Sequence, residues 1–218
     1  KMECCFMHQF AQGIIQKRLA TAAKALRANR MDAEILSGPQ ELLEKLRQLL
    51  PPKAIICSGG SMTLKETGVN DLLASGEYDF YYRGRTDENG EPIDVFRKAF
   101  SADWYFSSSN AITLNGELYN VDGNANRVAA LTFGPEHVVI IAGANKIVPD
   151  LEAARQRVRT IAAPANCLRL GIQNGCHQTG HCIDCKAPGH ICCTTVIHSF
   201  QRIPGRIKVF LLPQEFGY

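Results

Sequence analysis

The chain has 218 residues, of which 45% are hydrophobic and 21% charged, and its formal net charge is +3. This composition excludes an intrinsically disordered chain, and the scattered charges do not indicate a nucleic-acid-binding surface. No apolar run approaches the roughly 18–20 residues that span a bilayer, and the first residues lack the apolar region of a signal peptide. We therefore expect a cytoplasmic protein without membrane contact.

The first half of the chain alternates between helical and strand patterns. Residues 10–29 predict an amphipathic helix with Phe10, Ile14, Ala22 and Leu26 near one face, and Cys4 and Cys5 precede it as tail residues. Further along, the pattern predicts a strand at 31–36, a helix at 40–50, strands at 53–57 and around 78–82, a loop at 83–92, a helix at 93–100 and a strand at 104–107. The alternation predicts an α/β fold with a mostly parallel open sheet flanked by helices.

The second half adds a hairpin and a cysteine-rich segment. Asn115-Gly116 lies between the strand patterns 110–114 and 117–121, which predicts a β-hairpin with a type I′ turn. A buried strand at 137–142 and a charged helix at 150–163 follow, and strands at 194–198 and 206–212 close the chain. We interpret the whole as one domain with an α/β core at 10–163, a cysteine-rich metal loop at 164–193 and closing strands at 194–218.

Residues 176–193 carry five of the nine cysteines and three of the six histidines, with few apolar side chains to order them. Two of the cysteines have C-x2-C spacing, at which two thiolates can reach one metal, and two others flank this pair. The pattern favours a four-thiolate site, which either zinc or a [4Fe-4S] cluster would satisfy. Free thiols or a disulfide-stapled loop are the alternatives. The predicted ligands are Cys176, Cys182, Cys185 and Cys192, with Cys193, His177, His181 and His190 as substitutes.

A second candidate site follows the predicted strand at 53–57. Glycines at the carboxyl end of a buried strand let a ligand approach backbone N–H groups, and a similar strand end follows residue 142. Together these loops could hold a carboxylate or phosphate of a small molecule. Arg127 could instead pair with Asp122, and the other members have ordinary turn or loop roles. The predicted anion-binding residues are Gly59, Gly60, Ser61, Asn124, Asn126, Arg127 and Lys146.

Three segments resemble the lactate-utilisation, or LUD, domain family: residues 58–68 (SGGSMTLKETG), 110–130 (NAITLNGELYNVDGNANRVAA) and 138–148 (VVIIAGANKIV). The cysteine segment resembles that of a short LUD subgroup with Thr-Gly-x-Cys-x-x-Cys and a following Ile-Cys step. The resemblance implies a fold related to the CoA-transferase and ribose-phosphate-isomerase superfamily. It also implies a role beside iron–sulfur partners in oxidising lactate to pyruvate.

CoA transferases of that superfamily use a glutamate of the hairpin region as a nucleophile, whereas Leu114 occupies this place here. Glu117 and Glu66 are the remaining catalytic candidates. The sequence therefore predicts a redox component of lactate or organic-acid oxidation. The alternatives are an enzyme acting on an anionic acyl or phosphorylated substrate, and an organic-acid-binding regulatory module, each with the cysteines as a structural zinc site. Assembly into a homo-oligomer is compatible with each of them.

Overall fold

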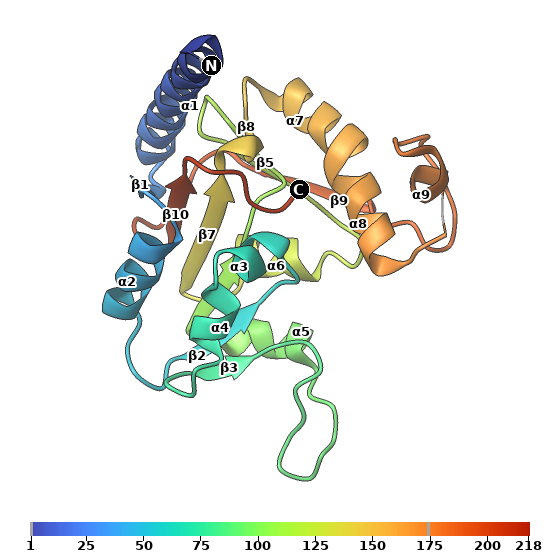
Figure 1. Cartoon of the computed structure of the whole chain (residues 1–218). Coiled ribbons are helices and arrows are strands. Elements are labelled where there is room, and N and C mark those ends of the chain that lie inside the picture. The colour runs from blue at the N-terminus through green and yellow to red at the C-terminus, as the bar shows by residue number, and fades with distance from the viewer. Residues whose placement is uncertain (1, 174) are drawn as a thin grey trace.

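The computed structural model describes residues 2–173 and 175–218, and helices cover both faces of a central six-stranded sheet (Figure 1). Neighbouring strands are parallel throughout this sheet. The predicted α/β fold with a mostly parallel sheet is therefore confirmed. The strand order is β1 (Asp32–Ile35), β10 (Ile207–Leu212), β7 (His137–Gly143), β4 (Trp104–Ser107), β2 (Ile55–Ser58) and β3 (Asp79–Tyr81).

Alternating side chains of the central strand β7 supply both faces of the sheet. Val138 and Ile140 pack into one apolar cluster, while Val139 and Ile141 pack into another. Successive side chains of a strand point to opposite faces, so a run of apolar residues is what a strand covered on both sides requires. The uninterrupted apolar pattern at 137–142 is thus explained by two helical layers.

The helices divide between these layers. Buried residues of α1 (Met2–Ala28) and α6 (Asn126–Phe133) belong to the first cluster. Those of α2 (Pro39–Leu49), α3 (Met62–Glu66) and α4 (Val69–Leu73) belong to the second. Helix α5 (Val95–Lys98) continues into a 3-10 turn at Ala99–Ser101 before β4.

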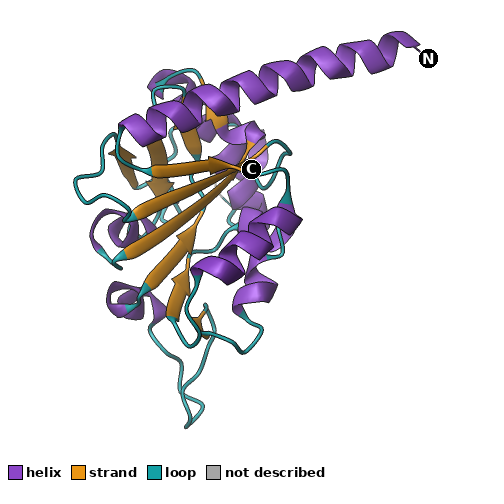
Figure 2. Ribbon diagram, turned by 90° about the vertical axis from the view of Figure 1, so that its left-hand side faces the viewer, coloured by secondary structure: helices purple, strands orange, loops and turns teal. Residues whose placement is uncertain are grey.

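Helix α1 begins earlier than predicted and buries a different set of residues. Its buried side chains are Leu19, Ala22, Ala23 and Leu26, whereas Phe10 is 65% exposed and Ile14 56% exposed. The predicted apolar face is therefore wrong in its first half. Figure 2 shows the physical reason, because the first turns of α1 extend beyond the strands of the sheet. The side chains of residues 2–8, which include Cys4 and Cys5, lie outside the described part of the structure.

A second, four-stranded sheet lies beside the first and was not predicted. It has the order β8 (Ile147–Val148), β5 (Ala111–Thr113), β6 (Leu118–Asp122) and β9 (Thr194–His198). Strands β5 and β6 pair as the predicted antiparallel hairpin. Helix α7 (Leu151–Arg157) contributes Ala154 to the apolar cluster on this sheet. The helical path continues through a π-helical turn at Val158–Ala162 into α8 (Ala163–Leu170), so the start of the predicted metal loop is helical.

The hairpin turn is not of the predicted type. A type I′ turn needs positive φ angles at both central residues, but Gly116 (φ 77°) has one and Asn115 does not. The Gly116 N–H donates to the Thr113 carbonyl (3.0 Å), which fits a three-residue loop that ends in a left-handed glycine. Helix α1 packs against this turn, and the Asn29 side-chain amide donates to the carbonyls of Asn115 (2.8 Å) and Gly116 (3.0 Å).

Within the described residues, none of the helices combines the length and the apolar character needed to cross a membrane.

Candidate functional site

A cavity lies where the connections of two neighbouring strands diverge. Helices α3 and α4, which follow β2, pack on one face of the sheet, whereas α6, which lies between β4 and β7, packs on the opposite face. Such a divergence leaves a crevice at the carboxyl ends of the strands, where open α/β sheets bind ligands. Here the crevice is a cavity of about 670 Å³. We call it the strand-end cavity.

All seven predicted anion-binding residues line the strand-end cavity, although they belong to loops far apart in the sequence. They are Gly59, Gly60, Ser61, Asn124, Asn126, Arg127 and Lys146. The convergence of these residues is a structural finding, and the binding of an anion by them stays a prediction.

The polar groups of this set are not equally available to a ligand. The Gly59 N–H donates to the Phe106 carbonyl (3.1 Å), and the Ser61 hydroxyl accepts from the Leu64 N–H (3.3 Å) at the start of α3. Neither Asn124 nor Asn126 makes a side-chain hydrogen bond with the described residues. Their side-chain amides are therefore available to a ligand.

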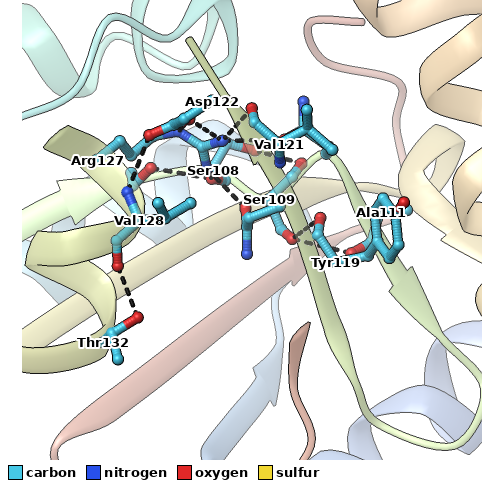
Figure 3. Close-up of polar contacts among 12 residues, drawn as sticks. Ser108, Ser109, Ala111, Tyr119, Val121, Asp122, Arg127, Val128 and Thr132 are labelled. Atoms are coloured by element: carbon cyan, nitrogen blue, oxygen red, sulfur yellow. Dashed lines mark hydrogen bonds and ion pairs between the residues drawn. The ribbon is translucent and has the colours of Figure 1, made fainter. Parts of the chain in front are cut away.

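Arg127 is fully engaged within the protein (Figure 3). Its Nε–H donates to Asp122 Oδ1 (2.9 Å), and its Nη1 donates to the Asn120 side chain (2.6 Å) and the Ser108 carbonyl (3.2 Å). Its Nη2 donates to the Asn110 side chain (2.9 Å) and the Val121 carbonyl (3.1 Å). A guanidinium has five N–H donors, and five acceptors surround it here. Arg127 does pair with Asp122, and it joins loops of the cavity wall instead of offering hydrogen-bond donors to a ligand.

Asp122 completes this arrangement at the start of α6. Its Oδ2 accepts from the Val128 N–H (2.9 Å), and the ion pair with Arg127 has a shortest distance of 2.7 Å. The Asp122 side chain is 9% exposed and that of Arg127 15% exposed. Nearby, the Ser109 hydroxyl lies between the carbonyls of Ala111 (2.8 Å) and Tyr119 (3.1 Å), as Figure 3 shows. These contacts hold the loop after β4 against the hairpin.

Lys146, which follows β7, is the buried cation with unused donors at this cavity. The residue is 4% exposed, and its Nζ donates to the Ser108 hydroxyl (3.0 Å). None of the ion pairs among the described residues includes it. Burial, followed by the charges of Arg157 and Arg127, lowers the pKa of Lys146 to about 7.

The cavity wall carries an excess of positive charge. Arg157 is 7% exposed and donates to the carbonyls of Asn145 (2.8 Å) and Asn110 (2.7 Å), and burial lowers its pKa. Arg157 is not itself among the lining residues, and the carboxylates of Glu66 and Glu215 act on Lys146 and on Arg157 respectively. The charged side chains that do line the cavity are four cations and one carboxylate, namely Arg83, Arg127, Lys146, Arg169 and Asp122. Buried charges are normally compensated, so an anionic ligand would be favoured here.

The lowered pKa of Lys146 predicts a pH-dependent effect of the Lys146→Met substitution. The folded amine loses its proton near pH 7 and the unfolded amine near pH 10.4, so the unfolded state binds more protons between these values. The stability of the wild-type chain therefore rises with pH in this window. As the pH rises from 7, the unfolding free energy of the variant minus that of the wild type should therefore fall, by up to about 1.4 kcal/mol per pH unit.

Urea denaturation of both chains at pH 7, 8 and 9 measures this difference. The control is Lys65→Met, which replaces an exposed lysine of α3 that does not line the cavity, and the pH trend of Lys146→Met should exceed that of this control. A constant difference for Lys146→Met would contradict the assigned titration.

Several cavity residues were not predicted from the sequence. Arg169 lies on α8, where Asn166 Oδ1 accepts from its Nε (3.1 Å) and Nη2 (2.8 Å), and its Nε also lies 2.6 Å from the Tyr218 hydroxyl. Its Nη1 has no hydrogen-bond partner among the described residues. Arg83 lines the opposite rim. No motif surrounds either arginine, and only the fold brings them to the cavity.

The two glutamates considered as nucleophiles do not line the strand-end cavity. Glu66 is exposed and accepts from the Gly217 N–H (2.6 Å), which holds the tail beside the cavity. Glu117 accepts from the Thr113 hydroxyl (2.8 Å) within the hairpin. Leu114 lies in the same hairpin and packs against the first apolar cluster. The structure thus offers no support for a hairpin carboxylate attacking a ligand in this cavity.

A smaller cavity of about 320 Å³ adjoins the first. Cys182, Cys185 and Cys192 line it, together with His190, and we call it the cysteine cavity. Cys192 and His190 also line the strand-end cavity, so the two cavities share part of their walls. Arg155, Arg159 and Lys186 also line the cysteine cavity. Asp184 lines it too and forms an ion pair with Arg159.

The fourth predicted cysteine lies beside one that was not predicted. Cys176, in α9 (Gly175–Thr179), is 3.2 Å from Cys167 of α8, measured between the two Sγ atoms, and both are buried. Burial and the hydrogen bond to the Cys167 sulfur raise the pKa of the Cys176 thiol to about 12, and the charges of Cys185 and Cys192 contribute to this rise. Burial, then Cys182 and Cys167, raises the pKa of Cys192 to about 11. Six sulfurs therefore take part in these electrostatic interactions, those of Cys167, Cys176, Cys182, Cys185, Cys192 and Cys193.

The described positions of these side chains do not define a metal-binding centre. Among the described residues, no group of three or more His, Cys, Asp or Glu side chains converges on a point that could hold one metal ion. Tetrahedral zinc with bonds of about 2.3 Å would need its sulfurs roughly 3.8 Å apart around such a point. Three of the predicted ligands, Cys182, Cys185 and Cys192, line the cysteine cavity, whereas Cys176 does not, so the four-cysteine centre stays a prediction.

The predicted substitute ligands differ in position. The Nδ1 atom of His190 lies 3.5 Å from the Sγ atom of Cys185. His181 is exposed, with Nδ1 3.1 Å from the Thr179 carbonyl, and neither it nor His177 lines the cysteine cavity. Cys193 is exposed, and its thiol donates to the His190 carbonyl (3.4 Å). His190 is thus the best-placed substitute.

The fold and these two adjoining cavities define an α/β protein with a basic ligand cavity and a neighbouring thiol-rich one. The chain belongs to the LUD domain family, a family linked to lactate utilisation, because the model of that family matches residues 19–212. The predicted resemblance is thereby confirmed.

A solved structure shows the same fold. A DUF162 family protein from Deinococcus radiodurans is similar over 92% of this chain and 98% of its own, with a TM-score of 0.51 and 14% sequence identity. The eIF2B delta protein from Chaetomium thermophilum is similar over 51% of this chain and 48% of its own, with a TM-score of 0.36 and 17% identity. A comparison with curated proteins found no significant match.

Proposed function

We propose that this chain is a cytosolic component of lactate or related organic-acid utilisation. In this proposal it binds a small carboxylate in the strand-end cavity, carries an iron–sulfur cluster in the cysteine cavity and supports the oxidation of lactate to pyruvate. The observation that carries the proposal is that Cys192 and His190 line both cavities. A redox centre in one cavity would then border a ligand in the other.

The charge around each cavity supports this assignment. The excess of buried cations beside Asn124 and Asn126 favours a carboxylate ligand. Arg155, Arg159 and Lys186 favour a negatively charged thiolate centre. Cys182, Cys185 and Cys192 would be ligands of the cluster, with Cys176 or Cys167 as the fourth, and the cluster would supply one-electron redox chemistry. The chain's own groups bind and orient the acid, and an iron–sulfur protein partner would exchange electrons with the centre.

The first test is the metal content of protein purified without oxygen. We expect iron with a matching amount of acid-labile sulfide and a broad absorption near 400 nm. The Cys182→Ser variant should lose most of the iron. Cys57→Ser is the matched control, because Cys57 is buried within the main core and lines neither cavity. Zinc without sulfide would overturn the cluster and favour a structural zinc site instead.

The second test is calorimetric titration with lactate and with pyruvate. We expect each to bind, and Asn124→Ala and Asn126→Ala to weaken binding about tenfold or more, as lost hydrogen bonds to a charged group do. The control is Asn89→Ala, which alters an amide of the exposed loop between β3 and α5. Equal affinities in all these variants would contradict a carboxylate site in the strand-end cavity.

A further inference from the structure

We propose that Lys146 is a nucleophile that forms a reversible imine with a 2-oxo acid in the strand-end cavity. This inference rests on the proposed assignment of that cavity to small carboxylates, and it does not depend on the cysteine cavity. It gives the chain a covalent step with a defined class of ligand, the carboxylic acids that carry a carbonyl group beside the carboxylate.

The position of the amine supports this role. Lys146 lines the cavity but is only 4% exposed, so it is enclosed on most sides by protein. A lysine whose only task was a salt bridge would have a carboxylate partner, and none of the described ion pairs includes this one. Its single described hydrogen bond, to the Ser108 hydroxyl (3.0 Å), orients the amine without neutralising it.

The surroundings also keep part of the amine population reactive. Only the neutral amine has the lone pair that attacks a carbonyl, and lysines become nucleophiles when desolvation or neighbouring cations favour this form. Both causes act here, because burial and the charges of Arg157 and Arg127 lower the pKa of Lys146 to about 7. About half of the amines are then neutral at pH 7.

The remaining cavity groups suit the carboxylate of the same ligand. The amides of Asn124 and Asn126 and the Nη1 atom of Arg169 have no hydrogen-bond partners among the described residues. A volume of about 670 Å³ exceeds what a three-carbon acid fills, so longer 2-oxo acids would also fit. A positive wall around a neutral amine binds the carboxylate while leaving the nucleophile uncharged.

The step balances without an oxidant or reductant. The nitrogen of Lys146 forms a bond to the carbonyl carbon, and both of its protons pass, directly or through solvent, to the carbonyl oxygen. The carbon–oxygen bond then breaks and the oxygen leaves as water, which gives a carbon–nitrogen double bond. Hydrolysis reverses each step and releases the unchanged 2-oxo acid.

Reductive trapping tests the inference on the full chain. Protein is incubated at pH 7 with pyruvate and cyanoborohydride, which reduces an imine to a stable amine, and the modified residue is located by peptide mass spectrometry. We expect a mass gain of pyruvic acid less one oxygen atom on Lys146. Labelling there should exceed labelling of exposed Lys65 roughly 100-fold or more, because the cavity would hold the bound 2-oxo acid beside the amine of Lys146. Lactate, which has no carbonyl group, should give no adduct.

Two variants and the binding measurement separate the outcomes. Lys146→Arg should abolish the adduct, and Lys65→Arg should leave it unchanged. The labelled peptide of the wild-type chain identifies the modified lysine without any substitution. Pyruvate binding with no adduct on Lys146, or with equal labelling of Lys65, would overturn the imine and leave the proposed function standing. Absence of pyruvate binding in the calorimeter would overturn both.

Discussion

Replacing Arg127 with methionine is expected to lower the free energy of unfolding by about 3–5 kcal/mol, the usual cost of removing one partner from a buried ion pair. The methionine keeps most of the apolar contacts of the arginine stem but leaves the Asp122 carboxylate, 9% exposed, without its cation. It also leaves the Ser108 and Val121 carbonyls without a donor. Denaturation by urea at neutral pH measures the loss.

The control for this substitution is Arg155→Met. Arg155 pairs with Glu152 at 3.8 Å on α7, but the two side chains are 56% and 64% exposed. Such pairs contribute little, so the control should change stability by less than about 0.5 kcal/mol. If Arg127→Met were as stable as the control and lost only its affinity for pyruvate, Arg127 would be a ligand-binding group and not the link between loops described above.

The Gly116→Ala substitution is expected to cost about 3 kcal/mol, from two causes that the structure separates. The φ angle of 77° disfavours a side chain by about 1–2 kcal/mol. The added Cβ would also lie 2.5 Å from the backbone carbon of Ala25 in α1, and relieving such a contact costs a further 1–3 kcal/mol. The same denaturation measurement gives the sum.

Gly90→Ala isolates the first of these causes. Gly90 has a similar φ angle of 83°, but no heavy atom lies within 4 Å of the place where its Cβ would be. We therefore expect a loss of about 1 kcal/mol there. Equal losses at the two positions would show that α1 moves away from the hairpin at little cost, which contradicts the close packing of Gly116.

The sequence predicted those parts of the fold that depend on local pattern. The apolar run of β7 indicated a strand covered on both faces, and the flanking strands of the hairpin were evident around Asn115 and Gly116. The type of turn was not evident, because it depends on the contact of Gly116 with α1 and not on the Asn-Gly pair alone. The exposure of Phe10 escaped prediction for a similar reason, since periodicity cannot tell where the sheet beneath a helix ends.

In the candidate site too, the sequence predicted what depends on local pattern and missed what depends on contacts between distant segments. Strand-end loops could be recognised from their glycines, so the seven predicted residues do line the larger cavity, whereas Arg83 and Arg169 were missed. Whether a polar group in such a loop is free depends on its neighbours, and the five acceptors around Arg127 come from residues between 108 and 122. Cys167 was missed because it lies within a helix without a ligand-like spacing. Only the packing of α8 against α9 brings it to Cys176.

The strand order has a consequence for how the chain is assembled during synthesis. Strand β1 emerges early, yet its only strand partner in the six-stranded sheet as described is β10, which lies between β1 and β7. Until residues 207–212 have been made, one edge of β7 and the edge of β1 that pairs with β10 lack their partner. Unpaired strand edges invite association between chains. Growing chains of this protein are therefore expected to need protection from one another until the last strand can insert.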